Sequence, residues 1–159
     1  MKLTQYFHDS SQTIEKLTAE LTEEHAGLFL NDRVNNIKWH IGHIALTRIY
    51  FLERSNPKLD PSRFLTPSER SLFDRGGTPP RNPEAYPSLG RLQDVFRRVG
   101  ETWLIHLEAL TSDDLQKPHS RTSDETLEAL LVFLLTHESY HCGQIGFIRS
   151  SSGYPSIFE

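Results

Sequence analysis

Apolar residues recur at three- and four-residue steps over most of the chain, a spacing that places side chains on one face of an α-helix. The pattern predicts four main helices, over about residues 2–24, 34–55, 88–110 and 126–150. No stretch alternates between apolar and polar residues as a half-buried β-strand does. We therefore expect an all-α fold in a single domain that covers residues 1–159.

The connection at 56–87 differs from the rest of the chain, because it contains seven prolines and no sustained period. Connections this long inside a compact domain are usually functional covers or disordered segments. Apolar residues such as Phe64 and Phe73 favour packing over disorder, with a short helical turn at 67–73. The turns at 25–33 and 111–120 are shorter, which predicts a four-helix bundle with a long connection between helices 2 and 3.

Two histidines interrupt the apolar stripe of the last helix. His137 and His141 are four residues apart, so both rings share one helix face and can reach a single divalent ion. The same stripe predicts that both imidazoles point into the core, where a polar ring needs a partner. The alternative interpretation is that the two histidines lie four residues apart by chance and bind no metal. A metal site also needs a third ligand from another part of the chain.

The candidates for a third ligand are the other histidines on apolar stripes. His40 and His43 lie on two different stripes of the helix at 34–55, and periodicity leaves both open. His106 lies near the end of its helix, where a histidine more often covers the edge of the core. The polar or loop positions of three others predict solvated surface residues: His8, His25 and His119.

Two segments, NNIKWHIGHIA at 35–45 and HESYHCGQIGFIR at 137–149, resemble the histidine motifs of the DinB and YfiT superfamily. The resemblance covers the whole chain and implies a metal-binding bundle with ligands His43, His137 and His141. His40 stands where that family usually has an aliphatic residue. Cys142 stands where it often has a basic one, and the connection at 56–87 is long for the family, so the substrate side of the site is expected to differ.

The resemblance also implies an activity. Members of this family bind a divalent ion such as zinc or nickel, are often homodimers, and include S-transferases that combine a low-molecular-weight thiol with a small-molecule substrate. Three protein ligands leave an open position on a metal, and a thiol or water bound there has a lowered pKa. The alternatives are a non-catalytic, stress-linked bundle with a structural metal, and a metal-dependent hydrolase in which water takes the open position.

Two neighbours of the histidines carry candidate chemistry. Glu138 is expected on the inward side of the last helix, where it would orient a ligand imidazole, shuttle a proton, or pair with Arg48 or another buried cation. Cys142 is a candidate nucleophile or fourth ligand, although a free cysteine is more often an inert small hydrophobe.

Composition excludes several classes of partner and location. The chain is 36% hydrophobic and has a net charge of −4 without a basic stripe, which argues against nucleic-acid binding. A single cysteine excludes an intramolecular disulfide and is compatible with a reducing compartment. No segment has the length of an apolar span or the pattern of a signal peptide. We therefore expect a cytoplasmic protein without a membrane partner.

Overall fold

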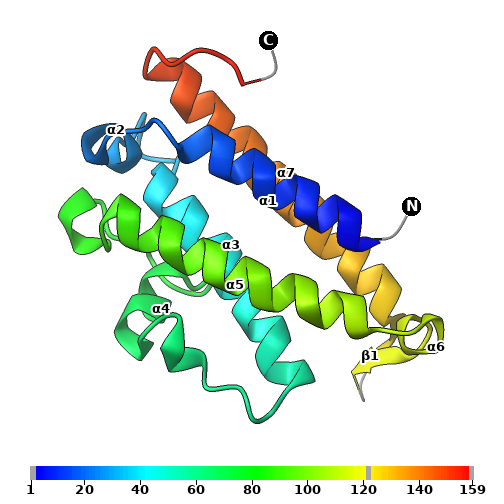
Figure 1. Cartoon of the computed structure of the whole chain (residues 1–159). Coiled ribbons are helices and arrows are strands. Elements are labelled where there is room, and N and C mark those ends of the chain that lie inside the picture. The colour runs from blue at the N-terminus through cyan, green and yellow to red at the C-terminus, as the bar shows by residue number, and fades with distance from the viewer. Residues whose placement is uncertain (1–2, 121–122, 158–159) are drawn as a thin grey trace.

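The computed structural model describes residues 3–120 and 123–157. Its four long helices are α1 (Leu3–Thr18), α3 (Ile37–Ser55), α5 (Leu89–Ala109) and α7 (Leu127–Ser151). Helix α1 lies along α7 and helix α3 along α5, while α1 also contacts α5 and α3 contacts α7 (Figure 1). The predicted all-α bundle with a long connection between its second and third main helices is confirmed.

The first two helix boundaries differ from the prediction. Helix α1 ends at Thr18 instead of near residue 24, and a separate short helix, α2 (Glu23–Gly27), takes up part of the expected turn. The Thr22 side chain accepts a hydrogen bond from the His25 N–H and so caps this new helix. Helix α3 begins three residues later than expected, because Asn36 caps it by accepting from the Trp39 N–H.

A small β-hairpin precedes α7, and the sequence pattern did not predict it. Strand β1 (Pro118–Ser120) pairs antiparallel with β2 (Ser123–Thr126), after a single-turn helix α6 (Ser112–Leu115). These strands contain three and four residues. That length is too short for alternation to register as a pattern.

The long connection is packed against the bundle, as its apolar residues predicted. It forms two short 3-10 turns, η1 (Pro61–Arg63) and η2 (Pro83–Ala85), and between them helix α4 (Pro67–Phe73), at the residues expected to be helical. A capping box between Thr66 and Glu69 fixes the start of α4. Phe64 and Phe73 are fully buried, and α4 packs against α3. The end of α4 lies beside His43 of α3, because the Phe73 carbonyl oxygen is 2.8 Å from His43 Nδ1.

The core lies between the long helices, with Trp103 of α5 edge-on to Phe7 of α1 at 5.2 Å between ring centroids. Helix α3 is buried along most of its length, which agrees with its two apolar stripes. Over the described residues, no helix combines the length and the apolar character needed to cross a membrane.

Candidate metal centre

Three imidazoles from α3 and α7 face one another through their Nε2 atoms. His137 Nε2 lies 3.2 Å from His43 Nε2 and 3.1 Å from His141 Nε2. One ring nitrogen of each residue lies within 4.8 Å of the other two. Two nitrogens bound tetrahedrally to one zinc ion, at ~2.0–2.1 Å each, are about 3.3 Å apart. The three residues expected as ligands are thus brought together at a spacing that can hold one metal ion.

Hydrogen bonds on the far side of two of these rings decide which nitrogen has a free lone pair. His43 Nδ1 lies 2.8 Å from the Phe73 carbonyl oxygen, and His141 Nδ1 lies 3.0 Å from Gln144 Oε1. Both partners are acceptors, so in each neutral ring Nδ1 carries the proton and Nε2 keeps its lone pair. Gln144 is held in turn, because its Nε2 donates to the Tyr140 hydroxyl at 3.2 Å. Metal-binding histidines commonly have such outer partners.

The position of Phe73 depends on a glycine beside His43. A Cβ atom added at Gly42 would lie 2.3 Å from Phe73 Cε1 and 2.5 Å from two other ring atoms. The Phe73 ring therefore occupies the space that any larger residue at 42 would fill. The sequence places Gly42 next to His43, but Phe73, which packs against Gly42, lies 31 positions away. The motif therefore gives no sign of this contact.

Burial keeps the three rings in the neutral form that binds metal. His43 and His141 are buried, whereas His137 is only half-buried, so the prediction that both α7 histidines are enclosed holds fully for His141 alone. Burial is the main cause that lowers the pKa of all three imidazoles. For His141, burial together with the neighbouring His40, His137 and His43 lowers the pKa to about 3.

His40 lies behind the three-histidine group. It is 1% exposed, and its Nδ1 is 3.0 Å from His141 Nδ1. Its Nε2 is buried and has no hydrogen-bond partner among the residues that the structure describes. His43, in contrast, stacks on Trp39 at 4.5 Å and turns its Nε2 towards His137. Both His40 and His43 contact histidines of α7. The periodicity of α3 therefore could not decide which of the two is the metal ligand.

The remaining histidines do not join this group. His106 packs against Phe51 with 5.7 Å between ring centroids, at the edge of the core as expected. His8 is exposed, but the prediction of solvated surface positions was wrong for two others. His25 is half-buried against Tyr154, and the His119 side chain is 14% exposed in the hairpin, 3.3 Å from Glu125.

Glu138 forms a buried ion pair, one of the roles that the sequence left open. Its carboxylate accepts two hydrogen bonds from the Arg48 guanidinium, both at 2.7 Å, and one from the Ser10 hydroxyl at 2.8 Å. Both residues are at most 2% exposed. The pair connects α3 to α7 next to His137. A proton-shuttle role for Glu138 stays a prediction.

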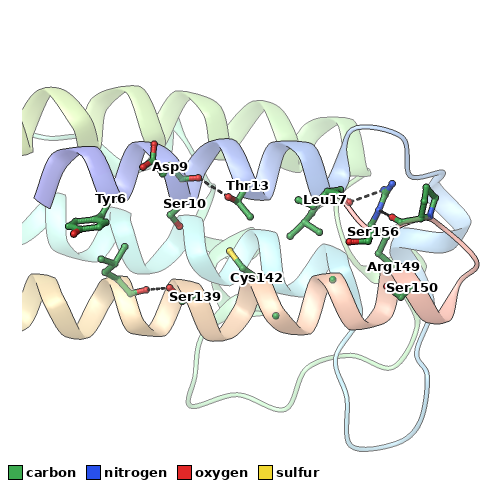
Figure 2. Close-up of a pocket in the computed structure, with 15 residues that line it drawn as sticks. Tyr6, Asp9, Ser10, Thr13, Leu17, Ser139, Cys142, Arg149, Ser150 and Ser156 are labelled. Carbon is green, nitrogen blue, oxygen red and sulfur yellow. Dashed lines mark hydrogen bonds between the residues drawn. The ribbon is translucent and has the colours of Figure 1, made fainter. Parts of the chain in front are cut away.

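Cys142 faces away from the histidines. Figure 2 shows it in a groove between α1 and α7, close to Ser10 and Thr13 of α1. The cavity that it lines has a volume of about 590 Å³. Burial, together with the charge of Glu138, raises the pKa of its thiol to about 11. Cys142 is therefore protonated at neutral pH, which argues against a role as nucleophile or metal ligand.

The three-histidine group is reached through a separate cavity of about 190 Å³. Its wall contains His43 and His137 but none of the residues around Cys142. The rest of the lining comes from α3, the end of α4 and α7: Leu46, Thr47, Tyr50, Phe73, Asp74, Arg75, Phe133 and Leu134. A small molecule in this cavity would lie against two of the three imidazoles.

Comparison with known proteins agrees with this architecture. A family model described as the DinB superfamily matches residues 5–145. No curated protein matches the chain. The crystal structure of a conserved protein from Enterococcus faecalis is similar in fold, with a TM-score of 0.73 over 94% of this chain and 96% of that one. The two sequences are 16% identical, so this likeness concerns the fold alone.

Proposed function

The chain belongs to the DinB superfamily, and from that premise we propose that it is a metal-dependent enzyme of the thiol-dependent S-transferase type. His43, His137 and His141 would hold one divalent ion, zinc or nickel. The observation that carries the proposal is the convergence of three Nε2 atoms at 3.1 and 3.2 Å. Lone pairs that face one another at this distance repel unless a cation or a proton lies between them.

The number of ligands and the access to them support a reactive site over a structural fastener. Structural zinc ions are usually closed by four protein ligands, whereas reactive ones keep an open position. Among the described residues, the group that can hold an ion has three members, and His43 and His137 line a cavity. An ion held there would lower the pKa of a bound thiol and supply a thiolate at neutral pH.

The polar groups of the cavity favour a thiol over water as the nucleophile. A hydrolase usually needs a base that takes a proton from water. Among the described residues that line the cavity, Asp74 supplies the one carboxylate, and the Tyr50 hydroxyl donates to it at 3.4 Å. Glu138 is occupied by Arg48 and Ser10. The pKa of a free thiol, about 8.5, is far below that of water, about 15.7, so a thiol on the metal loses its proton more readily without such a base. Transfer of a thiol is therefore the simpler reaction.

We also propose a homodimer. Three aromatic residues spaced seven apart on α7 are strongly exposed: Phe133 at 56%, Tyr140 at 63% and Phe147 at 61%. Exposed apolar stripes of this kind commonly mark protein contacts. Sedimentation equilibrium of the wild type and of Tyr140→Glu tests this proposal. A monomeric wild type at micromolar concentration would contradict it.

The activity is tested by incubating metal-loaded protein with a panel of cellular thiols and the electrophile monochlorobimane. We expect at least one thiol to be consumed faster than with folded His43→Ala protein, which serves as the control with a disrupted site. If the wild type consumes no thiol faster than the His43→Ala protein does, the transferase function is refuted. Turnover of an activated ester without a thiol, lost in the same variant, would point instead to the hydrolase.

A further inference from the structure

The small cavity beside the three histidines has apolar walls and, as far as the described residues show, one charged residue without a partner. Leu46, Phe73, Phe133 and Leu134 supply the walls. Its volume of about 190 Å³ corresponds to roughly six water molecules at ~30 Å³ each. The cavity therefore suits a small molecule, or the reacting end of a larger one.

Arg75 follows α4 and lies in the lining of this cavity. Among the described residues its guanidinium has no hydrogen-bond or ion-pair partner, and the residue is exposed. The neighbouring Arg70 differs, because it binds both carboxylate oxygens of Glu53 and lies over the Tyr50 ring at 5.0 Å. Arg75 is thus the cation in this region that is free to bind a ligand.

Arg75 shares the lining of the cavity with His43 and His137. Among the described residues of this lining Asp74 supplies the one carboxylate, and the Tyr50 hydroxyl donates to it at 3.4 Å. A guanidinium without a carboxylate partner at this end of the cavity favours an anionic ligand.

We propose that this cavity selects small thiols that carry an anionic group, with the carboxylate or a similar anion bound by Arg75 and the sulfur directed towards His43 and His137. A guanidinium binds a carboxylate through two parallel hydrogen bonds, which fixes the orientation of the ligand. The apolar walls then enclose the short chain between the two ends. This inference rests on the proposed function and names the substrate class of the same site.

The test compares thiols of similar size and different charge on cobalt-loaded protein. The probes are 3-mercaptopropionate, 2-mercaptoethanol and cysteamine, and binding is followed by the thiolate-to-cobalt absorption band at low ionic strength. We expect 3-mercaptopropionate to bind about five- to tenfold more tightly than 2-mercaptoethanol, and cysteamine to bind most weakly. Arg75→Gln should make the three affinities converge. Arg33→Gln, which removes an exposed charge outside the cavity lining, should keep the preference.

The outcomes separate this inference from the function on which it rests. Equal affinities in the wild type, or a preference that survives in Arg75→Gln, would overturn the role of Arg75 while thiol binding stands. No absorption band with any probe, on protein that retains cobalt by elemental analysis, would overturn both thiol binding and the role of Arg75. Protein that holds no cobalt would overturn the metal centre itself.

Discussion

Replacing Gly42 by alanine should damage the metal centre without touching a ligand. The new Cβ would lie 2.3 Å from Phe73 Cε1, whereas carbon atoms pack at about 3.5 Å, so the ring must retreat by roughly 1 Å. Phe73 is fully buried, and the open space beside it is the small cavity next to the histidines. A backbone shift of that size would lengthen the 2.8 Å bond between His43 Nδ1 and the Phe73 carbonyl beyond hydrogen-bond range.

Two opposing effects set the size of the change in the free energy of unfolding. Alanine gains about 1 kcal/mol over glycine inside a helix, while overpacking a core costs about 1–3 kcal/mol. We expect a net loss of up to about 2 kcal/mol in the free energy of unfolding of the metal-free protein. Loss of an outer partner of a ligand typically lowers metal affinity about 10- to 100-fold. Urea unfolding and a competition titration with a chelating dye measure the two quantities.

A matched control uses the same substitution where there is room. A Cβ at Gly143, inside α7, would meet nothing within 4 Å, so Gly143→Ala should stabilise by about 0.5–1 kcal/mol and leave metal affinity unchanged. In a Phe73→Ala background, Gly42→Ala should no longer destabilise. If Gly42→Ala alone behaves like Gly143→Ala, the predicted clash with the Phe73 ring does not occur.

Three further predictions follow from the buried polar groups. In the metal-free protein the folded-state pKa of His141, about 3, lies below the ordinary value of 6.5, so the unfolded chain binds more protons between these values. The stabilisation from neutral His141 should therefore be fully present above pH 6.5 and be lost progressively as the pH falls to about 3; urea midpoints that stay constant over this range would contradict it. Glu138→Gln should cost about 3–5 kcal/mol, because it leaves the Arg48 charge buried without its partner, and a loss below about 1 kcal/mol in urea unfolding would show that the pair is dispensable. Cys142, with a pKa of about 11, should react with a disulfide reagent at pH 7 far more slowly in the folded protein than in urea, and similar rates would contradict the raised pKa of its thiol.

The sequence predicts the parts of this structure that depend on local spacing. The helical period of α7 identifies His137 and His141, and the stripes of α3 narrow the third ligand to two residues of that helix. The choice of His43 over His40 depends on the rotation of α3 against α7, which two apolar stripes leave undetermined. Both residues are buried, but one directs Nε2 to His137 and the other meets the far side of His141.

The parts that escaped prediction depend on contacts between distant residues or on very short elements. The Phe73 carbonyl is a backbone group, so no side-chain pattern indicates that it holds His43. The hairpin strands are too short to alternate. The break after Thr18 lies inside a nearly continuous helical period, and the cap at Thr22 decides it.

The central claim, that three imidazoles hold one divalent ion, is tested most directly by metal content. Elemental analysis of purified, folded wild type should give about one ion per chain, with most of it lost in His43→Ala, which keeps two of the three ligands. His40→Leu should retain the ion, because His141 keeps its bond to Gln144 and the change removes a buried nitrogen without a partner. Circular dichroism confirms that each variant is folded. Metal retained by His43→Ala and lost from His40→Leu would contradict the account.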